Sequence, residues 1–533
     1  MATTASERPE SLWRIPHILD YRAPAWFERL PRWAATGGVL VFFFAISAFI
    51  RLHYLDGELW AEEGATVGVA THSLTQIPGI LWDGGGAPLY FWLLHVWMDG
   101  FGNSEIAVHA MSALAGLLTI PVAAWLAWGL WGRRAAYLAA ALFAFSGFLT
   151  QFAEEARPYE LMGLLGLLAA GSFLHVFVYR RRRGYLPLFT VSLILLAYTD
   201  YWGFFFWAGA GLALIVLWRR AEDRPGILRD ALIAYGIAAV VFLPWLPTLI
   251  HQIARSTSPW QYVALPGANM PRKLLGTDRV VAVLAFAWLA GLGTLLTRPL
   301  RRTPEATGAL ALFVMSLGAL LLALLALLVV PDWDYRLFAP LVAPVLLLSA
   351  LAGARSNILG LIMVALSCVF LANAASFISQ YKSDVKDIAG ELYPYLRTGD
   401  VVLVAQPEQT PLAWYYLPGG LRFETALGPD PHPSWMNWDD ALGRLQRSDP
   451  GRVVNQLVSG MRPGQHLLVI RPLTEGTVNW SEKWATLVRR RAAQLGEAAA
   501  SDPQLARLGN IYAPHYYHGS IYLPSSALLY TKR

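Results

Sequence analysis

Apolar stretches long enough to cross a lipid bilayer recur through the first 376 residues of this 533-residue chain. The hydrocarbon core of a bilayer is about 30 Å thick, so a spanning helix needs about 20 mainly apolar residues. We identify eleven such stretches, two of which are separated only by Asp200, Tyr201 and Trp202. The pattern predicts an α-helical multi-pass membrane protein. The stretches cover residues 34–53, 106–131, 135–152, 159–179, 185–200, 202–218, 231–250, 279–297, 307–330, 337–353 and 358–376.

The composition agrees with this class of protein. Charged residues make up 15% of the chain and hydrophobic residues 56%, whereas about 25% of an ordinary soluble protein is charged. This composition excludes a disordered chain and argues against a soluble globular enzyme. The net charge of +6 is mild, and nucleic acid is not an expected partner. A single cysteine, Cys368, excludes an intrachain disulfide and a cysteine-based zinc site.

Basic residues alternate between the connections that join the predicted spans. The amino-terminal arm, 1–33, contains five arginines, whereas the first connection, 54–105, has no lysine or arginine. The third connection has only Arg157 and the ninth only Arg336. Because cytoplasmic loops carry the excess of lysine and arginine, the arm is predicted to be cytoplasmic and the odd connections extracytoplasmic. The even connections carry Arg133, Arg134, Arg180–Arg183, Arg219, Arg220, Arg224, Arg229, Arg298, Arg301, Arg302 and Arg355.

The seventh connection, 251–278, departs from this alternation because it contains Arg255, Arg272 and Lys273. Two interpretations remain open at this point. The departure is either ordinary variation in the charge rule or a functional basic patch on the outer side.

The character of the sequence changes after residue 376. Short apolar runs at 401–405 and 467–470 alternate with helical patterns near 383–397, 438–447 and 483–498. This alternation predicts a small α/β domain. The predicted organisation is therefore a cytoplasmic arm at 1–33, a transmembrane domain at 34–376 and an extracytoplasmic α/β domain at 377–533. An even number of spans would place that domain on the other side.

The first connection contains two adjacent carboxylates, Glu62 and Glu63, just beyond a predicted span. The stretch 65–82 follows them, is apolar on one face, and is predicted to form a helix lying in the membrane interface. Carboxylates at such a place are costly unless they are used or solvated. One could act as a general base, and the other could hold water, an acceptor hydroxyl or a cation. The plainer interpretation is a solvated acidic turn.

The third connection, 153–158, places Glu154, Glu155 and Arg157 directly before Pro158 and Tyr159. Proline favours the first turn of a helix, and an acidic residue there would stabilise the helix amino terminus. A sharper interpretation pairs Arg157 with a carboxylate or a phosphate through two parallel hydrogen bonds. Each interpretation is consistent with this segment taken alone.

Five motifs occur in register along the chain. They are Arg51 followed by L-W-x-E-E at 59–63, P-L-Y at 88–90, F-G-x-S-E at 101–105, E-A-R-P-Y at 155–159 and F-L-P-W-L-P at 242–247. Together they resemble the bacterial branch of the GT-C membrane glycosyltransferases. That superfamily includes the protein O-mannosyltransferases and the lipid A aminoarabinose transferase. The resemblance covers residues from about 37 to 350 in order and spacing.

Two departures from the family pattern concern its chemistry. Glu62 stands where the family has aspartate, one methylene shorter, which leaves acid–base chemistry intact. Gly86 and Ala87 stand where the family has His-Pro. The missing imidazole removes a metal or phosphate role at that position. No cofactor is therefore indicated, and a divalent cation, although compatible with the chemistry, is not indicated either.

The resemblance implies that a sugar, most commonly mannose, moves from a polyprenyl-phosphate donor to a lipid, glycan or protein acceptor outside the membrane. It implies that Glu62 is the base that deprotonates the acceptor hydroxyl, with inversion at the anomeric carbon. Glu63 and Glu155 would orient the acceptor or stabilise the sugar's positive charge. Basic residues would hold the donor phosphate: Arg157, Arg336, Arg255 and Lys273. Four further residues are candidates for binding substrate: Glu154, Tyr159, Tyr90 and Asp334.

Two other functions remain as alternatives. A transporter or flippase of lipid-linked sugars would also have many spans and charges at the interface. Such a protein should show ionisable residues near the midplane, whereas the carboxylates here gather on one side. The Glu62 departure also leaves room for an inactive scaffold. The histidines His53, His95 and His109 lie on or near apolar faces, where packing is the default interpretation.

Overall fold

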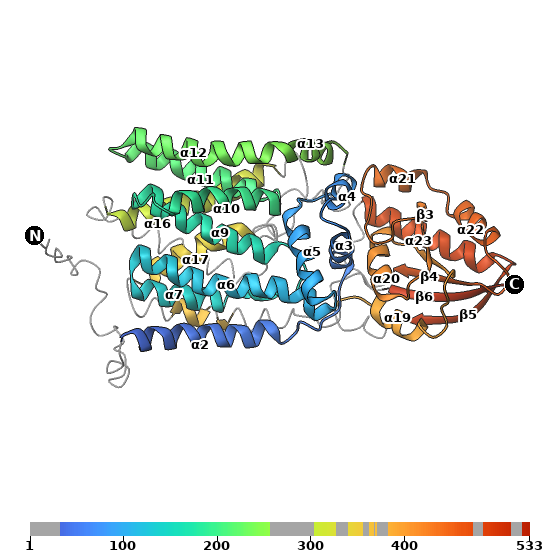
Figure 1. Ribbon diagram of the computed structural model, residues 1–533. Coiled ribbons are helices and arrows are strands. Elements are labelled where there is room, and N and C mark those ends of the chain that lie inside the picture. Colours follow the sequence, from blue (N-terminus) through green and yellow to red (C-terminus); the bar gives the residue numbers. More distant parts are fainter. Residues whose placement is uncertain are drawn as a thin grey trace, which may run out of the picture.

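The computed structural model describes residues 32–255, 303–326, 339–354, 362–366, 368–369, 382–472, 483–512 and 525–533. A helical bundle lies at one end of the molecule and a mixed α/β domain at the other, with the helices of the first connection between them (Figure 1). Three of the predicted phosphate- or substrate-binding positions lie outside the described residues, as does the predicted span at 279–297. These positions are Lys273, Asp334 and Arg336.

The bundle is built from apolar helices that follow the predicted spans closely. Among the described residues, five helical segments are long and apolar enough to cross a bilayer, and three apolar helices are shorter. The predicted total of eleven involves residues outside this set. The bundle helices are α2 (Arg32–Leu52), α6 (Glu105–Trp131), α7 (Arg133–Ala144), α8 (Gly147–Phe152), α9 (Tyr159–Phe173) with the π-helical turn η3 (Leu174–Val178), α10 (Tyr185–Thr199), α11 (Gly203–Arg220), α12 (Arg224–Phe242), the 3-10 turn η4 (Leu243–Trp245), α13 (Leu246–Arg255), α16 (Pro304–Ala326) and α17 (Ala339–Gly353).

Polar side chains set two of the boundaries between bundle helices. The closely spaced spans before and after residue 200 are separate helices, because Asp200 Oδ1 accepts the backbone N–H of Trp202 at 2.9 Å and turns the chain. The span predicted at 135–152 is instead two helices, α7 and α8. Ser146 separates them, and its side chain accepts the backbone N–H of Leu149, as an N-cap residue does.

Small residues bring the bundle helices close together. A side chain at Gly166 of α9 would overlap the backbone of Pro340 at the start of α17, and one at Gly209 of α11 would overlap α16. Helices in a bilayer have no hydrophobic driving force to associate, so they depend on the close van der Waals packing that small residues allow. The outer surface is apolar, with Phe49 73% and Leu232 65% exposed, as expected for lipid-facing side chains.

The first connection forms three short helices: α3 (Ala61–Ala70), α4 (Ile77–Gly84) and α5 (Leu89–Phe101). The stretch 65–82 was predicted as one interfacial helix and is broken between α3 and α4. Gln76 Oε1 accepts the backbone N–H and the hydroxyl of Ser73, and such local bonds compete with helix continuation. Pro78 then stands in the first turn of α4, a position that proline favours.

The C-terminal domain contains the predicted α/β fold. Its six-stranded sheet has the order β3-β2-β1-β4-β6-β5, in which β2, β1 and β4 are parallel and the other pairings are antiparallel. The predicted apolar runs are the central strands β1 and β4. The strands are β1 (Val401–Val404), β2 (Arg422–Thr425), β3 (Gly428–Asp430), β4 (His466–Pro472), β5 (Leu505–Tyr512) and β6 (Ser525–Lys532).

Helices cover both faces of this sheet, which explains why β1 is apolar throughout. Val401 and Leu403 pack against α21, α22 and α23, whereas Val402 and Val404 belong to a core shared with α19, α20 and the first connection. The helices are α19 (Val385–Leu392), the 3-10 turn η7 (Pro407–Gln409), α20 (Thr410–Tyr416), α21 (Ala441–Arg447), α22 (Pro450–Ser459) and α23 (Lys483–Ser501).

The C-terminal domain and the first connection are therefore tightly packed together. A side chain at Gly64 of α3 would come within 2.8 Å of the Leu412 Cα atom of α20. The Tyr416 hydroxyl accepts the backbone N–H of Leu59 at 2.8 Å and donates to Glu105 Oε1 at 2.8 Å. Lys386 Nζ lies 2.7 Å from the same Glu105 oxygen.

Candidate active site

The two adjacent carboxylates of the first connection lie in the first turn of α3. Trp60 has an extended backbone and its N–H donates to Glu63 Oε2 at 3.2 Å, so Glu63 helps to start the helix. Neighbouring side chains of a helix point about 100° apart. Glu63 is consequently fully buried, whereas the Glu62 side chain remains 17% exposed.

Glu63 is the centre of a buried polar cluster that joins four distant segments. Its Oε1 atom accepts the backbone N–H of Ala156 at 2.7 Å and lies 2.8 Å from His109 Nε2. Its Oε2 atom lies 3.1 Å from Lys382 Nζ. Burial alone would raise the pKa of Glu63, but the charges of Lys382 and His109 and the hydrogen bonds from His109 and Ala156 outweigh it and lower the pKa to about 2.

His109 connects this cluster to the end of the first span. Its Nδ1 atom lies 2.8 Å from the Leu55 carbonyl oxygen and its Nε2 atom 2.8 Å from Glu63 Oε1. Both ring nitrogens thus lie within hydrogen-bond distance of an oxygen atom, one on the main chain and one on Glu63.

Glu62 faces a different partner. Its Oε2 atom lies 3.0 Å from Arg157 Nη2, and the two side chains are 17% and 22% exposed. Arg157 also donates from Nη1 to the Thr66 hydroxyl at 3.0 Å and from Nη2 to the Tyr159 hydroxyl at 3.2 Å. The third connection thus places its arginine beside the Glu62 carboxylate of the first connection, and both side chains are partly exposed.

Tyr90 and Tyr159 support Arg157 and are themselves buried. The Tyr90 hydroxyl is 2.8 Å from the Ser112 hydroxyl, which donates to the Arg157 carbonyl oxygen at 3.2 Å. The guanidinium also lies over the Tyr159 ring, 5.6 Å from its centre. These contacts fix both the backbone and the side chain of Arg157.

Glu154 and Glu155 are buried beside the same cluster. The Glu154 carbonyl oxygen accepts a hydrogen bond from Lys382 Nζ. Burial, followed by the charges of Glu155 and Glu63, outweighs the charge of Lys382 and raises the pKa of the Glu154 carboxyl to about 8. Glu154 is therefore mostly protonated at neutral pH and can donate a hydrogen bond.

No protein-family description and no curated protein sequence matches the chain. Several solved structures are similar to it in fold. The Archaeoglobus fulgidus oligosaccharyltransferase in its apo form superposes with a TM-score of 0.51 at 13% identity, covering 92% of this chain and 74% of that one. The chain has the GT-C fold.

Two further structures are similar to this chain. Archaeal oligosaccharyltransferase AglB from Archaeoglobus fulgidus, in complex with an inhibitory peptide and a dolichol-phosphate, gives a TM-score of 0.50 at 13% identity over 92% of this chain and 74% of that one. ArnT from Cupriavidus metallidurans bound to undecaprenyl phosphate gives 0.47 at 16% identity over 93% and 98%.

Two other motif or candidate residues lie outside this cluster. Arg51 is buried inside the bundle, where Nη2 donates to the Phe143 carbonyl oxygen at 2.8 Å. Arg255 is exposed at the end of α13, and its carbonyl oxygen accepts the backbone N–H of Asp440 at 3.4 Å. Within the described ranges, no group of three or more histidine, cysteine, aspartate or glutamate residues could hold a metal ion.

Two members of the cluster, His109 and Lys382, were not expected from sequence. His109 follows the motif residue Glu105 by one helical turn, and this spacing was a usable signal. Lys382 lies 319 positions from Glu63, and nothing in its local sequence marks it.

Proposed function

We propose that this chain is an inverting glycosyltransferase that moves a sugar from a polyprenyl-phosphate donor to an acceptor hydroxyl at the outer face of the cytoplasmic membrane. Mannose is the first donor sugar to test, and a pentose such as arabinose is the second. The observation that carries the proposal is the partly exposed ion pair of Glu62 and Arg157, which a buried polar cluster holds at one end of a GT-C bundle.

Arg157 is proposed to bind the donor phosphate. Its planar guanidinium suits two oxygens of a phosphate, and its hydrogen bonds to Thr66 and Tyr159 hold it in place. The archaeal structure with dolichol-phosphate supports a donor of this class for the shared fold. The basic residues Arg255, Lys273 and Arg336 stay candidates for further contacts with the carrier phosphate.

Glu62 is proposed to be the general base. It removes the proton from the acceptor hydroxyl as the acceptor oxygen forms its bond to the anomeric carbon. The bond between that carbon and the phosphate oxygen breaks, and the polyprenyl phosphate leaves with the electron pair beside Arg157. Attack from the side opposite the phosphate inverts the anomeric carbon.

Donor binding would also free the base. In the structure Arg157 is paired with Glu62, so a phosphate that takes over the guanidinium leaves the Glu62 oxygen available for a proton. This exchange would delay activation of the acceptor until the donor has arrived.

Glu63 fits a positioning role better than an acid–base role. The charges and hydrogen bonds of its neighbours outweigh burial and favour the ionised form, and the side chain is fully buried. It would hold α3, α6, the third connection and Lys382 in register so that Glu62 and Arg157 meet. Glu154, protonated and close by, is proposed to donate a hydrogen bond to the sugar, while Glu155 and Asp334 remain candidates for substrate contacts.

The proposed orientation in the membrane comes from the distribution of lysine and arginine in the sequence. It places the amino-terminal arm in the cytoplasm and the C-terminal domain outside the membrane. The helices of the first connection and the C-terminal domain lie at the same end of the bundle (Figure 1). The third connection contacts the first through the Ala156 N–H bond to Glu63, which is consistent with their assignment to one side. Lipid, glycan and protein acceptors all carry hydroxyl groups that a general base could deprotonate, so all three classes remain candidates.

Feeding membranes that contain the chain with radiolabelled polyprenyl-phosphate mannose tests the function. Transfer of label to an acceptor in the wild type, but not in Glu62→Gln, is the expected result. A transporter or flippase would leave the label on its carrier and move it across the membrane in both proteins. That outcome, with arabinose donor equally inactive, would reject the glycosyltransferase.

A further inference from the structure

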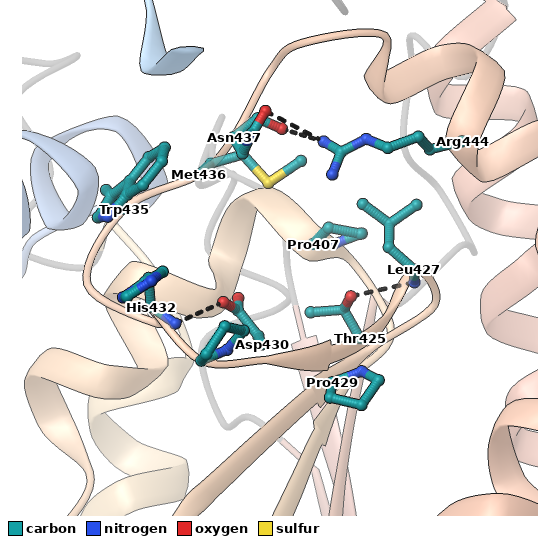
Figure 2. A pocket seen from close by; sticks show the side chains of 11 residues that line it. Pro407, Thr425, Leu427, Pro429, Asp430, His432, Trp435, Met436, Asn437 and Arg444 are labelled. Carbon is teal, nitrogen blue, oxygen red and sulfur yellow. Dashed lines mark hydrogen bonds between the residues drawn. The ribbon is translucent and has the colours of Figure 1, made fainter. Parts of the chain in front are cut away.

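The C-terminal domain contains a small pocket of about 190 Å³ beside the first connection. Figure 2 shows Trp435 and His432 on one side of it and Arg444 on the other. Asp430, Asn437 and Thr425 also line it. Pockets for drug-sized ligands measure about 300–1,000 Å³, so this pocket has room for one ring-sized group.

The pocket lies where this kind of sheet binds ligands. Thr425 is the last residue of β2, and Pro407 follows the end of β1 by three residues. In sheets of parallel strands, ligands bind at the carboxyl ends, near the point where the strand order reverses. Here β1 lies between β2 and β4, so the strand order reverses between β1 and β4. The pocket lies beside that point, at the ends of β1 and β2.

The side chains of the pocket combine a flat aromatic wall with hydrogen-bonding groups. The His432 and Trp435 rings are stacked, with centres 6.2 Å apart and planes 20° from parallel, and His432 is exposed. Arg444 donates from Nη2 to the Asn437 carbonyl oxygen, and its Nε atom has no hydrogen-bond partner among the described residues. The lining contains one arginine, Arg444, and one aspartate, Asp430, so it does not favour a strongly charged ligand.

The pocket is next to the helix that carries the proposed base. A side chain at Gly68 of α3 would overlap the carbonyl oxygen of Ser434, which precedes Trp435. The Trp438 N–H donates to the Asp83 carbonyl oxygen at 2.9 Å, which fixes the same loop to α4. Glu62 and Gly68 are six residues apart, or about 9 Å along a helix axis.

We propose that this pocket is an acceptor subsite that binds one neutral sugar ring of a glycan acceptor. A sugar ring has an apolar C–H face, which suits Trp435, and a rim of hydroxyls, which suits Asp430, Asn437 and Arg444. The inference rests on the proposed function and selects a glycan from among the acceptor classes. The bound ring would place a neighbouring sugar's hydroxyl toward Glu62.

A binding experiment tests the pocket without requiring activity. The full-length chain in detergent is mixed with methyl glycosides of neutral hexoses, and saturation-transfer difference NMR records contact. Saturation-transfer signals should appear with the wild type and with Trp435→Phe. The affinity for the glycoside should fall about tenfold in Trp435→Ala and stay unchanged in Tyr393→Ala. Tyr393 is a matched control because it is 61% exposed on the same domain and outside the pocket.

A kinetic experiment separates this inference from the function itself. Trp435→Ala should raise the acceptor KM about tenfold, whereas Tyr393→Ala, at an exposed position outside the pocket, should leave the acceptor KM unchanged. Signals of equal strength in the wild type and Trp435→Ala, or no signal in either, would overturn the subsite. Glycoside binding that depends on Trp435 in a chain that transfers no sugar would support the pocket and reject only the glycosyltransferase.

Discussion

Lys382 Nζ lies 3.1 Å from Glu63 Oε2, although the two residues are 319 positions apart. The contact joins the beginning of the C-terminal domain to the first turn of α3. Both side chains are almost completely buried. The C-terminal domain thus supplies the positive charge that pairs with buried Glu63, the neighbour of Glu62 in α3.

Removing the Lys382 charge should destabilise the protein. A buried carboxylate that loses one partner costs about 3–5 kcal/mol, so Lys382→Gln should lower the thermal unfolding temperature in nanodiscs markedly. Lys386→Gln is the control, because the Lys386 side chain is 40% exposed and pairs with Glu105 at 2.7 Å. Exposed pairs contribute only about 0–1 kcal/mol. Equal effects of the two substitutions would contradict the buried cluster.

Arg157 should be needed for use of the donor. Arg157→Gln should lower kcat/KM for a polyprenyl-phosphate sugar by about 100-fold, since a charged hydrogen-bonded contact contributes about 1.5–3 kcal/mol. Arg157→Lys should recover only part of this because it lacks the planar fork. Arg422→Gln, which changes an arginine with a 50% exposed side chain beside Glu424, should leave kcat/KM as it is. An unchanged donor kcat/KM in Arg157→Gln would remove its phosphate role.

Glu154 should make stability depend on pH. Its folded-state pKa of about 8 lies above the ordinary value of 4.5, so folding takes up a proton. Its stabilising contribution is therefore complete below about pH 4.5 and is lost as the pH rises to about 8. Glu154→Gln should flatten the fall in unfolding temperature between pH 5 and pH 8. The same slope in both proteins would show that Glu154 ionises normally.

Tyr416 should hold the first connection against the C-terminal domain. Tyr416→Phe leaves the buried Leu59 N–H without its acceptor, at a cost of about 1–3 kcal/mol, and hydrogen exchange around residue 59 should become faster. Tyr415→Phe is the matched control, since the Tyr415 hydroxyl donates to the exposed Asn103 carbonyl oxygen, which water can satisfy. Equal exchange in the two variants would argue against this anchor.

Local patterns in the sequence were sufficient to predict much of the fold. The apolar run at 106–131 is the helix α6, and the runs at 401–405 and 467–470 are the central strands β1 and β4. These signals depend on a residue's neighbours in the chain. The break between α3 and α4 was missed because the side chain of Gln76 competes with the helix backbone.

The site was only partly predictable for a related reason. The adjacent carboxylates at 62 and 63 and the arginine at 157 were identified as candidates, and the structure brings them together. Which carboxylate is buried could not be predicted, because that depends on Lys382 and His109, which reach Glu63 through the tertiary fold. The local pattern around His109 is that of an ordinary packed histidine.

The most direct test of the account is the single-turnover rate of sugar transfer by the purified full-length chain with polyprenyl-phosphate mannose. Glu62→Gln should bind the donor normally and transfer at least about 100-fold more slowly, the usual effect of losing a general base. Glu62→Asp should keep most of the rate because it retains a carboxylate. Transfer by Glu62→Gln at the wild-type rate would contradict the assignment of Glu62 as the base.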